Sequence, residues 1–324
     1  MTNGQVYRKT LSFSLLMFLI GIINFAVVIG LTTAGFFIFQ AINPDLALIG
    51  LPVGLVVGII VIALVNIFIT NRVKAAQISM MVKGVTEDKL PEHTFKEGFN
   101  ELRGRFAKIT VFFFITNSIK NIFRQIGRIF TRVGQAVGGN VGGSVTSAID
   151  SAVQTLIAYL CDCCLGWILY RKEVNAFKAA CEGTVIFFKH GKTLARNVGR
   201  IFGMGLLSLL LIGGIIGGGS YLIFLQFPQM FQSLANQIAA TGSEGSEVPA
   251  FLTNPTTLMI AVAVLVGIVL WSVIHSVLIR PFILVGVLRN YMAAGLADIP
   301  VESDFAALDS RSPRFARLRS RAEE

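Results

Sequence analysis

Asp162 is the acidic residue that lies deepest inside an apolar stretch of this chain, the run Ala148–Tyr170. An ionisable side chain within a membrane span costs about 2.5–3.5 kcal/mol on insertion scales, so it usually faces a bundle interior or a water path. Tyr159 precedes Asp162 by about one helical turn, and Trp167 follows it towards the end of the run. Because aromatic faces bind quaternary ammonium groups, these residues predict a binding site for a small organic cation.

A structural interpretation of the same run stays open. Asp162 would then pair with Arg171 or Lys172, and the aromatic residues would belong to a belt at the membrane interface. A second polar group, Trp271 and His275, lies one helical turn apart in the last long apolar run. On a transport hypothesis these two side chains join the substrate site, and otherwise they pack between helices.

The residue types of catalytic sites form no recognisable constellation. Cys161, Cys163 and Cys164 cluster, but a zinc site needs about four ligands, and the nearest histidine, His190, lies across a basic segment. We interpret the cysteines as packing residues, with reversible acylation as the alternative. The HExxH, GxSxG and Walker A motifs are absent from the sequence. The sequence therefore predicts no catalytic residue, no metal and no cofactor, in a protein that is not an enzyme.

These candidate residues belong to a chain built around long apolar stretches. Hydrophobic residues make up 54% of the chain and charged residues 14%. Several stretches exceed the ~20 residues with which a helix crosses a bilayer. They are Leu11–Gln40, Leu46–Thr70, Ile201–Phe227 and Thr256–Val287. The pattern predicts an all-α, polytopic transmembrane helical bundle, and the first stretch is too long for a cleaved signal peptide.

The basic residues indicate an orientation. Arg and Lys are dense after the second stretch, within Arg171–Arg200 and at the end of the chain, and are missing from Ala41–Asp45 and Pro228–Pro255. The positive-inside rule therefore places both termini in the cytoplasm and these two loops outside the cell membrane. The net charge of +10 is a topology signal, because no aromatic–basic module accompanies it to indicate nucleic-acid binding.

The segment 106–170 has two interpretations. It carries a basic helical stripe, including Lys120 and Arg124, before the apolar Ala148–Tyr170. Either it crosses the membrane twice, or it holds an interfacial amphipathic helix. We favour two crossings, which gives about six membrane helices with cytoplasmic amphipathic helices between them. The expected organisation is a transmembrane hairpin 1–71, a basic segment 72–105, a central helical pair 106–170, a basic segment 171–200, a transmembrane pair 201–290 with an outer loop 228–255, and a basic tail 291–324.

The basic tail predicts contact with anionic lipid headgroups. Each basic residue near an anionic membrane surface gains about 1 kcal/mol. The candidate lipid-binding residues are Arg314, Arg317, Arg319 and Arg321. We expect the tail to lie against the inner leaflet, with Phe315 dipping into the interface.

Glycine spacing and a short repeat add two hypotheses. Glycines one helical turn apart, such as Gly50 and Gly54, predict close helix approach in lipid. The glycines of Gly213–Gly219 either pack in the same way or break their helix to line a substrate path. Phe95–Gly98 (Phe-Lys-Glu-Gly) is echoed at Phe188–Gly191 (Phe-Lys-His-Gly), which raises the hypothesis of an internal duplication.

A series of features follows a recognisable order between about Phe99 and Gly295. The features are Arg103–Phe114, the amphipathic Ile119–Val133, Cys161-Asp162-Cys163-Cys164, Asn175-Ala176-Phe177, Gly183, Lys192–Arg196 and the final helices Ile201–Phe227 and Thr256–Val287. This order resembles the C-terminal half of the choline transporter-like membrane proteins. Members of that family have more membrane helices and a large outer loop after the first, which this chain lacks. The resemblance implies transport of a choline-like solute and transfers no individual substrate residue.

Two functions from different classes remain open on the sequence. The first is a transporter or facilitator of a small organic cation or polar metabolite. Its substrate site would comprise Asp162, Tyr159, Trp167, His275 and Trp271. The second is a non-transporting membrane scaffold or assembly factor. The expected partners are the lipid bilayer and its anionic headgroups, a small cationic solute on the first hypothesis, and a second copy of the chain; nucleic acid is not among them.

Overall fold

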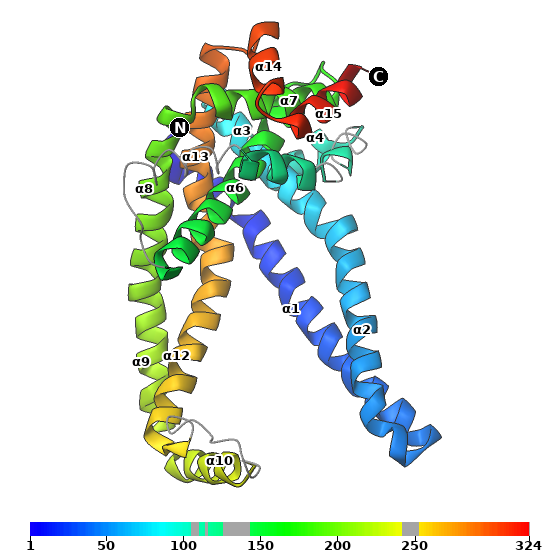
Figure 1. Cartoon of the computed structure of the whole chain (residues 1–324), viewed down its shortest axis with the longest axis vertical. Helices are drawn as coiled ribbons and strands as arrows, with labels where there is room; N and C mark the ends of the chain where they lie inside the picture. The colour runs from blue at the N-terminus through cyan, green and yellow to red at the C-terminus, as the bar shows by residue number, and fades with distance from the viewer. Residues whose placement is uncertain (105–109, 114–115, 126–142, 242–252, 324) are drawn as a thin grey trace. The chain divides into compact units, whose positions relative to one another are not determined.

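The computed structural model describes residues 1–104, 110–113, 116–125, 143–241 and 253–323 of the chain (Figure 1). These residues form helices joined by short turns, and no strand occurs among them, so the all-α prediction is confirmed. The chain divides into two compact units. The first contains Met1–Val198 together with Pro281–Glu324, and the second contains Gly199–Arg280.

Four helical stretches within the described residues are long and apolar enough to cross a membrane. They are Asn3–Ile42, Ile49–Thr86, Gly199–Phe224 and Pro255–Ala297. This finding supports an integral membrane protein. The apolar helix Gln154–Tyr170 is shorter than these stretches, and much of the segment 106–142 lies outside the described residues. Six membrane helices therefore stay a prediction.

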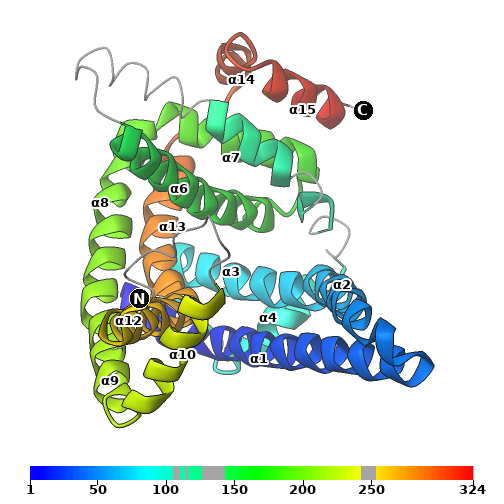
Figure 2. The same ribbon diagram turned by 60° about the horizontal axis from the view of Figure 1, so that its bottom comes forward.

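The first unit opens with a long helical hairpin. α1 (Asn3–Ile42) is followed by the short 3-10 turn η1 (Pro44–Leu46) and by α2 (Ala47–Val65). α1 begins after Thr2, whose hydroxyl accepts a hydrogen bond from the backbone N–H of Gln5 while the Gln5 side chain accepts one from the backbone N–H of Thr2. This reciprocal capping satisfies donors that a helix start leaves without partners. Figure 2 shows α1 and α2 side by side.

Glycine sets the spacing between α1 and α2. Gly35 of α1 lies directly against Gly50 and Gly54 of α2, so closely that backbone atoms occupy the space a Cβ atom would need. In lipid, where apolar burial gives little drive for association, such small residues let two helices approach and gain packing contacts. The packing role expected for Gly50 and Gly54 is therefore found in the structure.

α2 continues into a buried helix. The π-helical turn η2 (Asn66–Thr70) leads into α3 (Asn71–Thr86), most of whose residues are buried. The Gln77 side chain donates hydrogen bonds to the backbone oxygen of Thr10 at 3.3 Å and to Ser14 Oγ at 2.7 Å, both on α1. These polar bonds satisfy an amide that would otherwise be costly to bury, and they fix α3 against the base of α1.

α4 (Thr94–Leu102) covers the same base with aromatic side chains. Phe13 of α1 is fully buried, and its ring lies 5.0 Å from that of Phe95 and 5.9 Å from that of Phe99, measured between ring centroids. A Cβ atom at Gly98 would come within 2.6 Å of the Phe13 ring. Glycine is therefore required at position 98 for α4 to reach Phe13.

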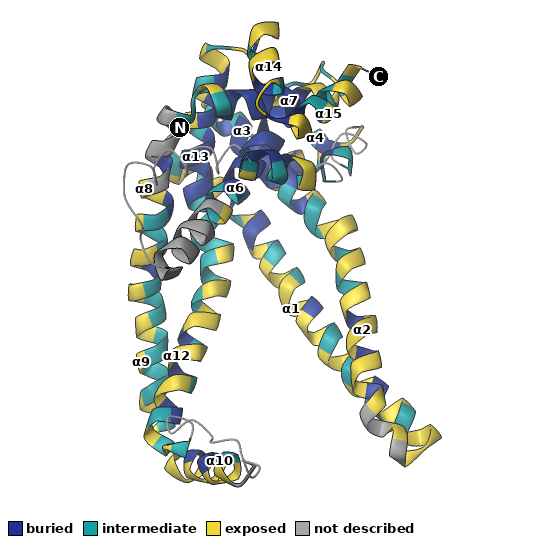
Figure 3. Ribbon diagram, in the orientation of Figure 1, coloured by how far each residue is buried: buried dark blue, intermediate teal, exposed yellow. Residues whose placement is uncertain are grey.

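The centre of the first unit is formed by α6 (Gly143–Tyr170), α7 (Ala176–Lys189) and α13 (Arg280–Ala297). Figure 3 shows the buried residues gathered in these helices and in α3, whereas α1 and α2 are largely exposed beyond their base. The Tyr291 hydroxyl on α13 donates a 2.6 Å hydrogen bond to the backbone oxygen of Gly183 on α7. The unit thus combines a packed helical domain with apolar helices that extend from it.

The end of the chain packs onto α7. α14 (Glu302–Asp309) and α15 (Pro313–Glu323) both contact it, and the rings of Phe305 and Phe315 stack with centroids 6.4 Å apart. Phe315 is fully buried. The expectation that Phe315 dips into the membrane interface is therefore wrong, because the apolar face of α15 is already covered by the chain's own helices.

The second unit contains the second apolar hairpin. It begins within α8 (Gly191–Ser208), at Gly199. The elements that follow are the π-helical turn η3 (Leu209–Gly213), α9 (Gly214–Phe224), α10 (Pro228–Thr241), α12 (Pro255–Ile274) and the π-helical turn η4 (His275–Ile279). Gly267 of α12 approaches the backbone at Gly213 and Gly217, and its Cβ would lie 2.7 Å from the Gly213 oxygen. The packing role of Gly213 and Gly217 thus has a structural basis, and α9 continues unbroken through Gly214–Gly219.

Candidate functional site

Asp162 lies in the core of the first unit and faces a basic residue from α3. It is 4% exposed, and its Oδ1 lies 2.5 Å from the Nζ of Lys74. The Lys74 side chain keeps 30% of its surface exposed, so the ammonium group lies at the edge of the core. Coulombic attraction strengthens where water is excluded, so the structure neutralises the charge that the sequence assigned to a cationic substrate.

Arg171 and Lys172, the partners expected for Asp162, bind other acids. Arg171 Nε donates to Glu182 Oε2 at 3.0 Å, and Lys172 Nζ lies 3.3 Å from Glu101 Oε1. The end of α6 directs these two basic side chains towards α7 and α4. Lys74, a basic residue of the segment 72–105, takes their place.

Trp167 is fully buried and donates a hydrogen bond to the same carboxylate as Arg171 does. Its indole N–H donates a 2.9 Å hydrogen bond to Glu182 Oε2, and a Cβ atom at Gly295 would meet its ring at 2.7 Å. Tyr159 is also buried, at 2% exposure. Both rings are thus enclosed by the chain's own residues in this structure.

All four cysteines are buried and reduced. Burial raises the pKa of the Cys181 thiol on α7 to about 12, so almost none of it is thiolate at neutral pH. A buried thiol is not accessible to an acyl donor, which favours the packing interpretation over acylation. Among the described residues, no group of three or more His, Cys, Asp or Glu is arranged to hold a metal ion.

The second predicted polar group lies within the second unit. The Trp271 indole N–H donates a 3.0 Å hydrogen bond to Ser208 Oγ, and its ring lies 5.1 Å from the His275 ring, between centroids. His275 begins the π-helical turn η4. These contacts hold α12 against the end of α8, as expected of residues that pack between helices.

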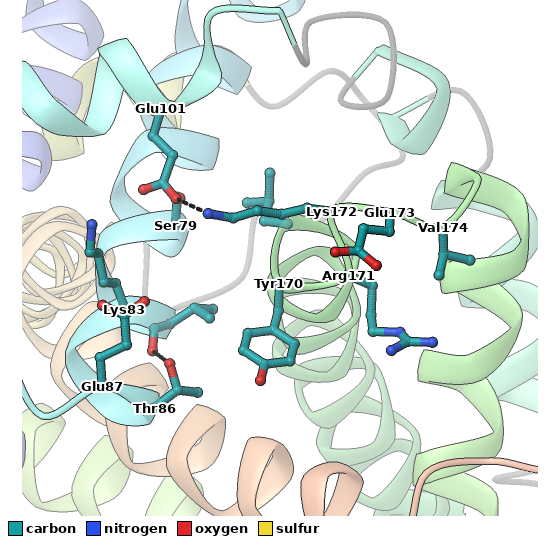
Figure 4. Close-up of a pocket in the computed structure, with 12 residues that line it drawn as sticks. Ser79, Lys83, Thr86, Glu87, Glu101, Tyr170, Arg171, Lys172, Glu173 and Val174 are labelled. Carbon is teal, nitrogen blue, oxygen red and sulfur yellow. Dashed lines mark hydrogen bonds and ion pairs between the residues drawn. The ribbon is translucent and has the colours of Figure 1, made fainter.

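An open polar cavity of about 340 Å³ lies in the first unit between the end of α3, Glu101 of α4 and the end of α6 (Figure 4). Figure 4 shows Lys172 reaching across to Glu101 beside the Tyr170 ring, while Arg171 points away. The second carboxylate oxygen of Glu101 is buried and has no hydrogen-bond partner among the described residues. Sequence analysis missed this cavity, because its polar residues come from three segments that no local pattern connects.

The arginines of the tail fall into two groups. Arg319 pairs with Glu302, with Asp309 at 2.7 Å and with Glu323 at 3.2 Å, so it stabilises the packing of α14 and α15. The remaining three arginines predicted to bind lipid are exposed. They are Arg314, Arg317 and Arg321. The structure thus assigns Arg319 an internal role that its position in a basic run did not indicate.

Neither a protein-family model, nor a characterised protein, nor a solved structure matches this chain. The described residues define the class as an all-helical protein, with four stretches long and apolar enough to span a membrane.

Proposed function

We propose that this protein is a membrane scaffold, in which apolar helices anchor a packed helical domain and no solute is carried across the bilayer. The observation that supports the proposal is the ion pair between Asp162 and Lys74. A carboxylate that binds a cationic substrate must exchange one counter-ion for another as the substrate passes. Asp162 instead has a counter-ion within the domain, and breaking such a buried pair is costly.

The apolar helices support the same proposal. Between Leu11 and Thr70 the sequence contains one charged residue, Asp45, which lies at the turn between α1 and α2. Both helices expose large apolar side chains, such as Phe25 of α1 at 68% and Ile59 of α2 at 55%. Such surfaces are suited to lipid, and a path for a charged solute would need polar groups facing it.

Uptake into proteoliposomes tests the absence of transport. The full chain would be reconstituted and supplied with radiolabelled choline, with protein-free vesicles and the Asp162→Asn variant as controls. We expect the same uptake in all three preparations. Uptake above that of the empty vesicles that disappears in Asp162→Asn would contradict the scaffold proposal and restore Asp162 as a substrate residue.

The scaffold proposal includes an orientation with both termini and the packed domain in the cytoplasm, supported by the positive-inside rule. Single cysteines at Ser233 on α10 and at Ser303 on α14 test it, since both positions are exposed and the native cysteines are buried. We expect an impermeant maleimide to label Ser233→Cys in intact cells and Ser303→Cys only after permeabilisation. The reverse pattern would contradict the orientation.

A second candidate function is the binding or transport of a small organic cation, as the resemblance to choline transporter-like proteins implies. The specific observation in its favour is the buried Glu101 oxygen without a hydrogen-bond partner among the described residues, beside the Tyr170 ring in the cavity. Calorimetric titration of the purified protein with choline tests it. Binding that is lost in Glu101→Gln and kept in the exposed control Glu92→Gln would support this function, and the absence of binding would remove it.

A further inference from the structure

The helix α15 carries arginines on a face that its own acids do not reach. Arg314, Arg317 and Arg321 are spaced by three and four residues, which places them on one face of a helix. All three are exposed, whereas Arg319, on a different face, is paired with three carboxylates. α15 thus contains one arginine, Arg319, that is paired with carboxylates, and three arginines on another face that lie in an exposed group.

These arginines form one wall of a groove, and a different helical segment forms the other wall. The groove has a volume of about 340 Å³, and it also includes Ser118 and Asn121 from the helical segment 116–125 and Leu318 of α15. No carboxylate occurs among the described residues that line it. A serine hydroxyl and an asparagine amide add neutral hydrogen-bond donors to the guanidinium groups.

Both walls are held in place by buried contacts. On α15, Phe315 and Leu318 are buried. In the segment 116–125, Ile119, Ile122 and Phe123 are buried, and the Phe123 ring meets that of Phe187 on α7 edge to face at 5.2 Å.

A hydrogen bond joins the two walls directly. The hydroxyl of Ser312, just before α15, donates to the side-chain oxygen of Gln125 at 3.0 Å. The positions of the two walls are therefore set by the packing of the first unit, which prepares the groove for a ligand without a large ordering cost.

We propose that this groove is a binding site for a phosphate group. Guanidinium groups form paired, charge-assisted hydrogen bonds with phosphate oxygens, and three of them can neutralise a phosphate dianion. Bringing three like charges together is unfavourable unless an anion compensates them. The phosphate belongs to either a soluble compound or the headgroup of an anionic lipid, since both present the same chemistry to the groove.

The test uses the full chain in nanodiscs, with separate arms for the two sources. In the first arm, nanodiscs of phosphatidylcholine are titrated calorimetrically with inorganic pyrophosphate at constant ionic strength. In the second arm, phosphatidic acid replaces part of the phosphatidylcholine, and native mass spectrometry counts the phosphatidic acid retained per protein. Binding in the first arm identifies a soluble source, and retention in the second arm alone identifies a lipid; either result supports the site.

Variants connect the binding to the groove. We expect Arg314→Gln/Arg317→Gln/Arg321→Gln to weaken binding at least about tenfold, because the charge-assisted bonds are the strongest contacts available. The corresponding lysine variant should bind with intermediate affinity, since lysine keeps the charge and loses the planar fork. A matched control, Lys96→Gln/Arg103→Gln/Lys178→Gln, removes the same charge from exposed positions elsewhere and should bind as the wild type does. Binding in neither arm, equal binding by the glutamine variant, or equal loss in the control would overturn the proposal.

Discussion

Two helices that leave the apolar hairpins, α2 continuing into α3 and α12 continuing into α13, share a construction but differ in how their ends are held. Each pairs with its neighbour through glycine, passes through a π-helical turn and continues as a helix with a largely buried face. Each continuation ends in the same pattern, Met-x-x-Gly, at Met81–Gly84 and at Met292–Gly295. π-helical turns often mark functional sites or junctions within long helices, and here they stand between the apolar spans and the buried continuations.

The likeness extends beyond the helix ends. Leu90-Pro91 corresponds to Ile299-Pro300, Phe95 of α4 to Phe305 of α14, and Arg105-Phe106-Ala107 to Arg314-Phe315-Ala316. The duplication hypothesis itself rests on a different echo, between Phe95–Gly98 and Phe188–Gly191. The echoed tetrads differ in structure, because the first lies within α4 whereas the second spans the end of α7 and the start of α8.

The difference lies in the contacts of the buried continuations. α3 is held by polar side chains, Lys74 with Asp162 and Gln77 with Ser14. In α13 the fully buried contacts are apolar apart from the Tyr291 hydroxyl bond, with Gly295 under the Trp167 ring. Its other polar bonds, from Arg289 to Asn3 and Met1 and from Asn290 to Asn197, lie at part-buried positions. The apolar stretches share the same glycine contacts because close packing is the main interaction that holds helices together in lipid. The buried continuations can be held either by polar side-chain bonds or by apolar packing.

The largest expected effect is at Lys74. Lys74→Met removes the ammonium group that faces the buried Asp162 carboxylate, and we expect unfolding free energy to fall by about 3–5 kcal/mol. Asp162→Asn should cost less, about 1–3 kcal/mol, because the partly exposed Lys74 can turn to water. Denaturant unfolding followed with a thiol-reactive dye on the buried cysteines measures both. Equal losses in the two variants would show that the pair does not hold α3.

The glycines at the ends of α3 and α13 come next. Gly295→Ala forces a methyl group against the Trp167 ring and the Ile186 side chain, with approaches of 2.7 and 2.6 Å, and should cost about 1–3 kcal/mol. Gly84→Ala meets only the flexible ends of Val6 and Leu90, at 3.0 and 3.1 Å, and should cost less. The same dye assay compares them. A larger loss of unfolding free energy for Gly84→Ala than for Gly295→Ala would show that α3 is packed more tightly than α13 at these positions.

The hairpin glycines allow a test inside the second unit. Gly267→Val places a side chain against the α9 backbone, whereas Gly214→Val faces open space, with nothing within 4 Å of its Cβ position. Spin labels at the exposed Ile215 and Val264 report the separation of α9 and α12. We expect a longer and broader distance distribution only for Gly267→Val. An unchanged distribution would show that close glycine contact does not set the hairpin.

The smallest expected loss of stability comes from removing the charge of Asp304 on α14. The hydrogen bond from the Val301 N–H, and then the one from Lys189, lower the pKa of Asp304, so its contribution is present above the ordinary value of 3.8 and is lost as pH falls through the lower folded pKa. Hydrogen bonds to Asp298 and Asp304 raise the pKa of Lys189, so its contribution is present below 10.5 and is lost as pH rises through the higher folded pKa.

Asp304→Asn should therefore lower stability at pH 7 by less than about 1 kcal/mol. The deficit should disappear once the wild-type carboxylate is protonated. Ser303→Ala is the adjacent control. Unfolding midpoints measured at a series of pH values from 7 downwards follow the effect, and a deficit that does not shrink as the pH falls below 3.8 would contradict the assignment.

The sequence by itself determined that the chain is helical and contains long apolar spans. Composition and run length carry this information directly, because a bilayer accepts only backbone that bonds within its own helix. Glycine spacing likewise predicted the close helix approach found at Gly50 and Gly54. These properties depend on residues near one another in sequence.

Only the tertiary structure decided which charges meet. Asp162 met Lys74, Arg171 met Glu182 and Lys172 met Glu101, and each pair joins helices whose relative placement no local pattern specifies. The same holds for Phe315, whose place in a basic helix suggested lipid although α7 and Phe305 cover it. Helical periodicity shows that a face is apolar or charged, but the partner of that face is chosen by packing among distant segments.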